Sequence, residues 1–349
     1  MDYKMLHGGG LRAASSPSTA QRGDPEGVRG LPSALPEGAF ETVDEVEALL
    51  GGVEERSPAA LAGPAHEALT SGGKRLRPLL LVLCARIGQP ERGDLLRAAT
   101  AIEVLHTATL IHDDIVDKAE NRRGQPTTVT RYGREAAIAT GDYLFAEAFS
   151  ELAEIGDPRL VRAFSEASEG LAAGELEQYR ADGATVDVEA YLEHIRKKTA
   201  GLFKAACVAG GTLGGLSLRQ IDSLATYGQA LGIAFQMSDD IMDLVGKPGL
   251  MGKGIGTDLA EGTVTLPVIF ALREGDAPTI RKVLAAPNPS AELLEAGIEA
   301  VLATDAVAKT EAWARGEIDA ALEGLGLLPD CPEREFLEVI ASEVVGRDA

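Results

Sequence analysis

Two clusters of aspartate residues share one pattern, Asp-Asp-x-x-Asp, and occur in two well-separated helical stretches. They comprise Asp113, Asp114 and Asp117 in the first stretch, and Asp239, Asp240 and Asp243 in the second. The first and last aspartates of each cluster are four residues apart, so on a helix they lie on the same face, one turn apart. Two carboxylates placed in this way repel each other, and a hard divalent cation that prefers oxygen ligands removes the repulsion. The two clusters therefore predict a magnesium-diphosphate site between two helices.

An acidic, solvent-exposed helix face is the ordinary explanation of such a run of charges. The apolar neighbours of the aspartates argue against this alternative. Ile111 and Ile115 accompany the first cluster, and Ile241 and Leu244 accompany the second, so both helices are expected to be largely buried. Because buried carboxylates need partners or metal ions, the metal site is the favoured interpretation.

A basic segment, GGKRLRP at residues 72–78, comes directly before an apolar stretch that is predicted to be a helix. Its two glycines allow close approach of the backbone to a ligand, and Pro78 suits the first turn of a helix. Cations at a helix N-terminus attract anions, so the segment predicts a diphosphate site, with a solvated basic loop as the alternative. His106 lies on the same helical stripe as Asp113 and is a further candidate phosphate ligand.

Three further groups of cations have the composition of diphosphate-binding segments. Arg122 and Arg123 lie in a turn, NRRGQP, and an arginine side chain binds phosphate oxygens bidentately. The run RKKT at residues 196–199 precedes an apolar stretch, where inward-facing charge requires an anionic partner. The glycine-rich segment GKGIGTDL at residues 252–259 carries Lys253 and is typical of a lid over a charged substrate.

Helical periodicity accounts for almost all of the chain that must position these groups. The expected helices span residues 41–50, 58–71, 76–88, 92–119, 131–154, 158–182, 187–214, 217–245 and 263–274, with shorter ones after them. No strand-like alternation is present. Residues 1–37 are rich in Gly, Pro, Ser and Ala without periodicity and are expected to be a disordered tail. Residues 38–349 are expected to form one all-α domain of packed long helices.

Composition narrows the class of protein. The chain has 349 residues with 45% hydrophobic content, enough for a large core, and its net charge of -21 disfavours nucleic acid as a partner. Cys84, Cys207 and Cys331 are widely spaced, which is typical of reduced thiols in a cytosolic protein. No apolar run reaches the roughly 18–20 residues that span a bilayer, and no export signal is recognisable. We therefore expect a cytoplasmic protein without a transmembrane segment.

Seven segments in order resemble the motifs of the trans-isoprenyl diphosphate synthases, or polyprenyl synthetases. They are GGKRLRP, HTATLIHDDIVD, RRGQPT, KTAGLF, FQMSDDIMD, GKGIGTDL and TVTLP. The resemblance covers about residues 45–347, and the joint pattern is far more specific than either aspartate cluster. It implies an isoprenoid-synthase-type bundle of long helices around a central cavity, usually as a homodimer. It also implies magnesium-dependent, head-to-tail condensation of isopentenyl diphosphate with an allylic diphosphate.

The resemblance implies roles for individual residues. The implied magnesium ligands are Asp113, Asp117 and Asp239, with Asp243 supporting them, and Asp114 and Asp240 lie behind these ligands. The implied isopentenyl diphosphate pocket contains Lys74, Arg77, His106 and Arg123. Around the allylic diphosphate the resemblance implies Arg122, Lys198, Thr199, Gln236 and Lys253. Of these sets, the residues expected to act in catalysis are Asp113, Asp117, Arg122, Lys198, Asp239 and Gln236. Thr263 stands where many relatives have lysine, so one diphosphate contact is expected to differ.

Product length is expected to depend on residues just before the first aspartate cluster. In the resembled family a bulky residue four or five positions before Asp113 limits the chain, and here these positions hold Thr109 and Ala108. Both are small, so the product is expected to be longer than C20, as a quinone side chain requires. Leu105, or the aromatic residues Phe145 and Phe149, would then set the floor of the cavity.

Two alternatives remain open at this point. A terpene cyclase or a short-chain (farnesyl or geranylgeranyl) synthase would share the fold, but cyclases usually lack a second Asp-Asp-x-x-Asp cluster together with the GGKRLRP segment. A non-catalytic partner subunit of a heteromeric synthase would be expected to lose metal-binding aspartates, whereas all six are present here. Elongation of a labelled substrate distinguishes these alternatives.

Overall fold

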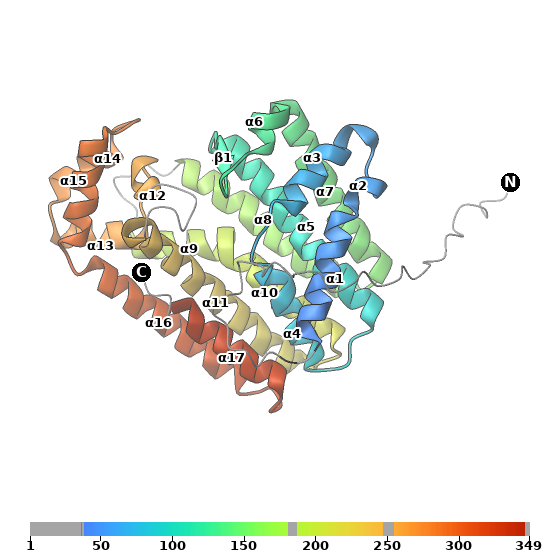
Figure 1. The fold of residues 1–349 in the computed structure, drawn as a ribbon. Coiled ribbons are helices and arrows are strands. Elements are labelled where there is room, and N and C mark those ends of the chain that lie inside the picture. The colour runs from blue at the N-terminus through green and yellow to red at the C-terminus, as the bar shows by residue number, and fades with distance from the viewer. Residues whose placement is uncertain (1–35, 37, 181–186, 247–254, 346–349) are drawn as a thin grey trace, which may run out of the picture.

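The computed structural model describes residues 36, 38–180, 187–246 and 255–345. In this part of the chain the fold is a bundle of packed α-helices, with one two-stranded hairpin (Figure 1). The prediction of an all-α protein is confirmed. The predicted tail, residues 1–37, lies outside the described residues except for residue 36.

The elements follow one another in a simple order. The first part contains α1 (Ala39–Gly51), α2 (Val53–Arg56), α3 (Ala59–Thr70), α4 (Leu76–Arg86), α5 (Arg92–Val116), β1 (Asn121–Arg122), β2 (Gln125–Pro126), α6 (Thr128–Tyr132), α7 (Arg134–Ile155) and α8 (Pro158–Arg180). The second part contains α9 (Val188–Ile195), the π-helical turn η1 (Arg196–Ala200), α10 (Gly201–Leu213), α11 (Leu218–Val245), α12 (Thr257–Ala260), α13 (Leu266–Glu274), α14 (Ala277–Leu284), α15 (Ala291–Leu302), α16 (Ala306–Leu325) and α17 (Pro332–Val345).

Long helices at the centre of the bundle carry the aspartate clusters. Helix α5 packs against α7 and α4, and α11 packs against α10 and α16. Figure 1 shows α16 and α17 along one side of the bundle and α1 to α3 on the opposite side. A capping box between Ser217 and Gln220 begins α11, and Glu91 caps the start of α5 by accepting a hydrogen bond from the Asp94 amide.

Three local features differ from the periodic pattern. The helix expected at 131–154 is interrupted at Gly133, whose φ of 87° belongs to the left-handed region and separates α6 from α7. The helix expected at 187–214 contains the π-helical turn η1, which inserts a wider turn between α9 and α10. The NRRGQP turn forms the hairpin of β1 and β2, whose two-residue strands are too short to give an alternating pattern.

Close packing of α11 against η1 and α10 depends on two glycines. A Cβ atom on Gly232 would lie 2.6 Å from the Cα of Ala200, and one on Gly228 would lie 2.8 Å from the carbonyl oxygen of Phe203. Side chains at these positions would therefore push the helices apart. The close contact places Gln236, one turn after Gly232, beside Thr199 of η1.

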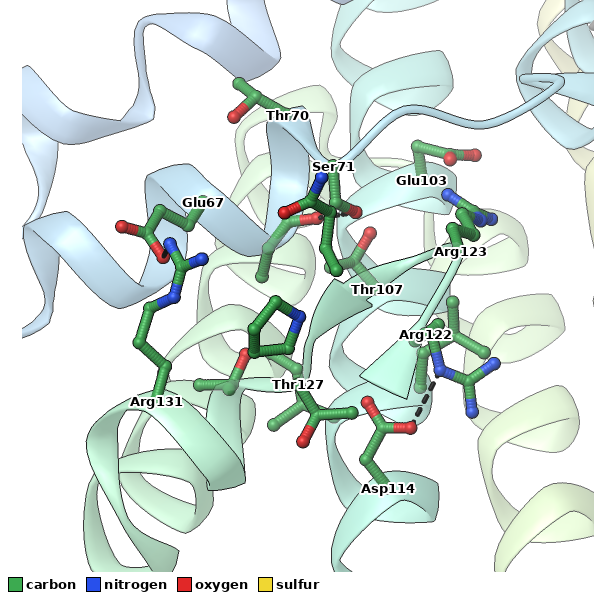
Figure 2. A pocket seen from close by; sticks show the side chains of 16 residues that line it. Glu67, Thr70, Ser71, Glu103, Thr107, Asp114, Arg122, Arg123, Thr127 and Arg131 are labelled. Carbon is green, nitrogen blue, oxygen red and sulfur yellow. Dashed lines mark hydrogen bonds and ion pairs between the residues drawn. The ribbon is translucent and has the colours of Figure 1, made fainter. Parts of the chain in front are cut away.

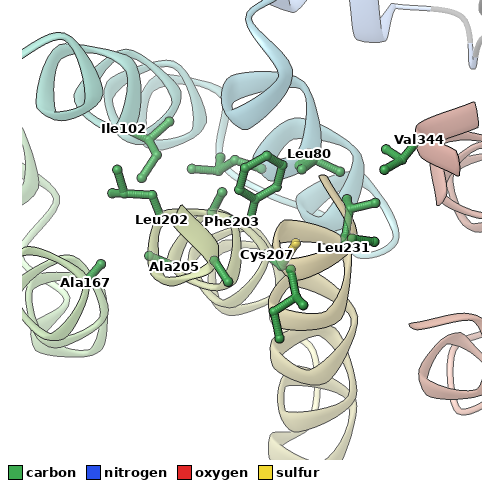
Figure 3. Close-up of a cluster of buried hydrophobic side chains, with 14 of the residues drawn as sticks. Leu80, Ile102, Ala167, Leu202, Phe203, Ala205, Cys207, Leu231 and Val344 are labelled. Atoms are coloured by element: carbon green, nitrogen blue, oxygen red, sulfur yellow. The ribbon is translucent and has the colours of Figure 1, made fainter. Parts of the chain in front are cut away.

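A buried hydrophobic cluster joins these central helices. Figure 3 shows Leu80 of α4, Phe203 of α10 and Leu231 of α11 converging from three helices. Cys84 and Cys207 are buried free thiols and Cys331 is a half-buried free thiol, as expected from their spacing. Among the described helices, none is both long and apolar enough to cross a membrane.

Candidate active site

The glycine loop before α4 binds an arginine of the hairpin. Gly72 and Gly73 have φ of 83° and 152°, which favour glycine. The Arg123 side chain donates a hydrogen bond to the carbonyl of Gly72. A Cβ on Gly73 would lie 2.8 Å from Nη1 of Arg123, so a larger residue would displace this arginine. The loop and the hairpin thus form one cationic surface, on which Lys74 is exposed.

Arg77 and His106 form a neighbouring pair, from α4 and α5. Nη1 of Arg77 lies 3.1 Å from Nε2 of His106, and the guanidinium lies 4.6 Å from the ring centroid of Phe203. Because arginine only donates, Nε2 must accept and His106 must be neutral. Burial and the charge of Arg77 lower the pKa of His106 well below its usual value. Burial also lowers the pKa of Arg77 to about 10.

Arg77 retains an unused donor. Its Nε is buried and has no hydrogen-bond partner among the residues that the structure describes. A buried donor without an acceptor is costly, so the atom fits a site that receives an anion from outside the chain. The neighbouring Arg123 and the glycine loop offer further donors to the same anion.

The first aspartate cluster lies at the end of α5. Asp114 is buried and accepts a 2.8 Å hydrogen bond from Nε of Arg122, whereas Asp113 is half-buried and Asp117 is exposed just after the last residue of the helix. Burial raises the pKa of Asp113 to about 7 against the opposing charge of Lys198, and the carboxylate of Glu175 raises it further. Negative charge at Asp113 is therefore only partly compensated by the protein.

The π-helical turn presents Lys198 to this cluster. Nζ of Lys198 lies 2.7 Å from Oε2 of Glu175 in α8, and the positive charge acts on Asp113. The preceding Arg196 pairs with Glu189 at 3.0 Å. The sequence predicts an anionic partner for the inward-facing cations, and for Lys198 this partner is Glu175. The sequence pattern did not single out Glu175, because it is one of several glutamates on an amphipathic helix.

The second aspartate cluster is held by a chain of hydrogen bonds. Asp240 is buried and accepts bonds of 2.6 Å from the hydroxyl of Tyr191 and 2.8 Å from Nε2 of Gln236. The hydroxyl of Thr199 in turn donates a 2.7 Å bond to Oε1 of Gln236. The structure therefore brings Thr199, Gln236 and Asp240 together. Tyr191 was missed, because a tyrosine in an amphipathic helix carries no signal of a distant carboxylate.

Asp239 and Asp243 lie on either side of this buried carboxylate in sequence. Asp239 is half-buried, and its charge acts on Arg77 in α4. Asp243 accepts 3.1 Å hydrogen bonds from the backbone amides of Thr257 and Asp258, which begin α12. Asp243 thus fixes the C-terminal part of the predicted lid, residues 252–259. Lys253 itself lies outside the described residues.

Thr263, at the position where lysine was expected, lies just after α12. Its backbone amide donates a 2.8 Å hydrogen bond to the carbonyl of Asp258. The residue is half-buried.

The carboxylates at the ends of α5 and α11 are suitable ligands for a hard cation. Among the described residues, no three Asp, Glu, His or Cys side chains lie close enough to enclose a metal ion by themselves. Magnesium commonly binds one or two carboxylates and completes its octahedral shell with water and substrate phosphates. The partly compensated charge of Asp113 fits such a site, in which a ligand supplies the remaining oxygens.

A pocket of about 360 Å³ opens on another face of α5 (Figure 2). It lies between α3, α5, the hairpin and α6, and its wall includes Thr107, Asp114 and Arg122. Arg131 and Glu67 form an ion pair of 2.7 Å at its edge. Asp114 of the first aspartate cluster lines this pocket, whereas Asp113 and Asp239 do not.

The residues expected to control product length lie on α5, which packs against α7. Leu105 and Ala108 are fully buried, and Thr109 is almost so. One turn after Ala108, the ring of His112 stacks on Phe145 of α7 with centroids 5.7 Å apart. Phe149 is a partly buried member of the same core.

Comparisons with known proteins show which family the chain resembles as a whole. The sequence model of the polyprenyl synthetase family matches residues 58–301. The heptaprenyl diphosphate synthase component 2 of Geobacillus stearothermophilus is 36% identical over 304 residues, which cover 84% of this chain and 93% of the relative. The octaprenyl diphosphate synthase of Escherichia coli K12 is 37% identical, over 80% of this chain and 88% of the relative.

A solved structure has the same fold. The polyprenyl synthase of Caulobacter crescentus CB15, in complex with calcium and isoprenyl diphosphate, superposes with a TM-score of 0.84. The two chains are 32% identical, and the match covers 89% of this chain and 96% of that chain.

Proposed function

The chain belongs to the polyprenyl synthetase family of trans-prenyltransferases, and we propose that it condenses isopentenyl diphosphate head-to-tail onto an allylic diphosphate. The proposed product is an all-trans-polyprenyl diphosphate longer than C20, of the kind that supplies a quinone side chain. The similarity to heptaprenyl and octaprenyl diphosphate synthases supports this product class. The short-chain alternative predicts products of fifteen or twenty carbons.

The observation that carries this proposal is that two adjacent arginines bind two different parts of the site. Arg122 binds Asp114 in the first aspartate cluster, whereas Arg123 binds the glycine loop at Gly72. The hairpin therefore connects an acidic site with a cationic site. Two diphosphate substrates need two such neighbouring sites, one reached through metal ions and one formed by protein cations.

We assign the cationic site to isopentenyl diphosphate. Lys74, Arg77, His106 and Arg123 are the proposed contacts. The buried and unpaired Nε of Arg77 and the neutral His106 support the assignment, because they offer donors and an uncharged ring to the diphosphate. This pocket binds the substrate that keeps its diphosphate throughout the reaction.

We assign the acidic site to the allylic diphosphate. Asp113, Asp117 and Asp239, supported by Asp243, are the proposed ligands of magnesium, which when bound would neutralise charge on the departing diphosphate. Lys198 and Arg122 provide fixed positive charge beside Asp113. The hydrogen bond between Thr199 and Gln236 holds the hydroxyl and the amide that are proposed to lie around the allylic diphosphate. Lys253 is the proposed contact from the lid.

The reaction follows from this arrangement. The allylic C–O bond breaks, and its electron pair leaves with the diphosphate oxygen, whose developing charge Lys198 and Arg122 stabilise. The double bond of isopentenyl diphosphate then attacks the allylic carbon. Loss of a proton to the released diphosphate restores a trans double bond. No side chain acts as a nucleophile in this scheme, and apolar residues of α5 and α11 exclude water from the cation.

We further propose that the chain works in the cytoplasm as a homodimer. The free thiols of Cys84, Cys207 and Cys331 support a reducing compartment. A heteromeric enzyme is the alternative, since the Geobacillus relative is named as one component of a synthase.

One assay tests the proposed function and its alternatives. The purified chain alone is incubated with labelled isopentenyl diphosphate and farnesyl diphosphate, with magnesium or with excess chelator. The proposal predicts incorporation of label that needs magnesium and no second polypeptide. Absence of incorporation by the chain alone, with recovery when a cell extract is added, would instead support a partner subunit.

A further inference from the structure

One cation of the GGKRLRP segment turns away from the cationic site. Arg75 precedes the first residue of α4, has a left-handed φ of 46° and is only 8% exposed. Its guanidinium donates to Glu47 of α1 through Nε at 2.6 Å and Nη2 at 2.9 Å, and to Glu103 of α5 through Nη1 at 2.6 Å. Nη2 also donates to the carbonyl of Leu69 at 2.7 Å.

Glu103 links this network to the proposed isopentenyl diphosphate pocket, because it lies close to His106 in the sequence. It is 4% exposed and lies one turn before His106 on α5. It lines the same pocket as Arg123, and Figure 2 shows the two side chains close together. Its negative charge also acts on Arg77 and raises the pKa of both arginines against the effect of burial.

A buried carboxylate next to a cationic pocket presents an electrostatic problem. An unpaired buried charge is strongly unfavourable, so Glu103 needs a cation. If Glu103 formed an ion pair with Arg77 or Arg123, the charge of that arginine would be neutralised before a diphosphate bound. The pairing of Glu103 with Arg75 at 2.6 Å reduces this competition.

We propose that Arg75 is a positioning residue for the isopentenyl diphosphate pocket, which holds and neutralises Glu103 so that Arg77 and Arg123 remain available to the substrate. This inference rests on the proposed function of that pocket. The proposed role of Arg75 involves no contact with substrate. It acts through Glu103, while its bonds to Glu47 and Leu69 anchor the start of α4 to α1 and α3.

Arginine suits this position better than lysine. The guanidinium directs donors at two carboxylates and one carbonyl at once, in fixed planar directions. A lysine has one compact charge and cannot keep the double contact to Glu47 while reaching Glu103. The left-handed φ of Arg75 aims the side chain inward, whereas Arg77 faces His106.

A double-mutant cycle tests the proposal. Arg75→Met should raise KM for isopentenyl diphosphate roughly tenfold, because Glu103 then pairs with the substrate's own ligands. KM for the allylic substrate should change less than about threefold. Adding Glu103→Gln to Arg75→Met should return KM for isopentenyl diphosphate to within about threefold of wild type. KM does not depend on the fraction of active enzyme, so partial misfolding does not imitate this pattern.

The double variant is decisive even if Arg75→Met fails to fold. It contains no unpaired buried charge from this pair, and thermal unfolding and circular dichroism establish that it is folded. A KM near the wild-type value supports the proposal. A KM raised about tenfold in the folded double variant contradicts it, because Arg75 would then serve the substrate directly or by shape alone. Failure of the proposed function looks different, since wild type itself would then incorporate no isopentenyl diphosphate.

Discussion

The hydroxyl of Tyr191 donates a 2.6 Å hydrogen bond to Oδ2 of Asp240, and both residues are buried. Tyr191 comes from α9 and Asp240 from α11, so the bond joins the helix that precedes the π-helical turn to the helix that carries the second aspartate cluster. Burial and the adjacent Asp240 raise the pKa of Tyr191 above its usual value, which keeps the hydroxyl protonated as the donor. The bond fixes the middle residue of the second aspartate cluster.

Removal of this hydroxyl should reduce stability. Tyr191→Phe leaves one oxygen of a buried carboxylate without its donor and should lower the free energy of unfolding by about 1.5–3 kcal/mol. Tyr143→Phe is the matched control, since its hydroxyl accepts a 3.1 Å bond from Ser57 and no charged group is involved. Chemical denaturation compares the two. An equal loss of unfolding free energy in both variants would show that the bond to Asp240 contributes no more than a bond between uncharged groups.

Asp113 should be essential for turnover. Asp113→Asn keeps the shape but removes a charge from the proposed metal site, and kcat should fall at least about 10²-fold. Asp319→Asn on the exposed face of α16 is the matched control and should be nearly neutral. Steady-state kinetics at saturating magnesium measure the effect. Turnover close to wild type in Asp113→Asn would remove Asp113 from the metal site.

His106 should make stability depend on pH. Its folded pKa lies below the usual value, so the unfolded chain takes up the proton first and the free energy of unfolding falls as pH decreases through about 6.5. His106→Gln keeps an acceptor for Arg77 but cannot titrate. Wild type should therefore lose about 1 kcal/mol more than His106→Gln between pH 7.5 and 5.5 in denaturant titrations. His66→Gln, in α3, controls for the substitution itself, and parallel pH profiles of wild type and His106→Gln would count against a neutral His106.

Ala108 should control product length. It is fully buried on α5, one turn before His112, whose ring stacks on Phe145 of α7. Ala108→Tyr places a ring in the path of a growing chain and should shorten the main product without abolishing catalysis, because the aspartates are untouched. Ala108→Ser, which adds one oxygen atom, should leave the product unchanged. Chromatography of the products decides, and an unaltered length in Ala108→Tyr would locate the limit deeper, at Leu105 or Phe149.

The helices and the chemistry of their ends were predictable because the signals are local. The four-residue spacing of Asp113 and Asp117 placed two carboxylates on one helix face, and the glycines before Arg77 indicated a loop for an anion. Both features need only the residues themselves and helix geometry. The placement of α5 relative to α11 in space could not be predicted from such local signals.

The remaining features depend on partners that are distant in sequence. Arg75 was read with the other cations of its segment, but its φ of 46° and the buried acid Glu103 turn it inward. Likewise, the ion pair of Lys198 with Glu175 joins two helices, and no periodicity records which glutamate faces the lysine. The π-helical turn was missed because its sequence is compatible with an ordinary helix.

The size of the wild-type product is the most direct test of whether this chain makes a long polyprenyl diphosphate. Purified chain, farnesyl diphosphate, excess isopentenyl diphosphate and magnesium are incubated to completion, and the dephosphorylated products are identified by mass spectrometry. We expect all-trans polyprenols longer than C20, spaced by one isoprene unit. Products that stop at fifteen or twenty carbons, or cyclic hydrocarbons formed without isopentenyl diphosphate, would contradict it.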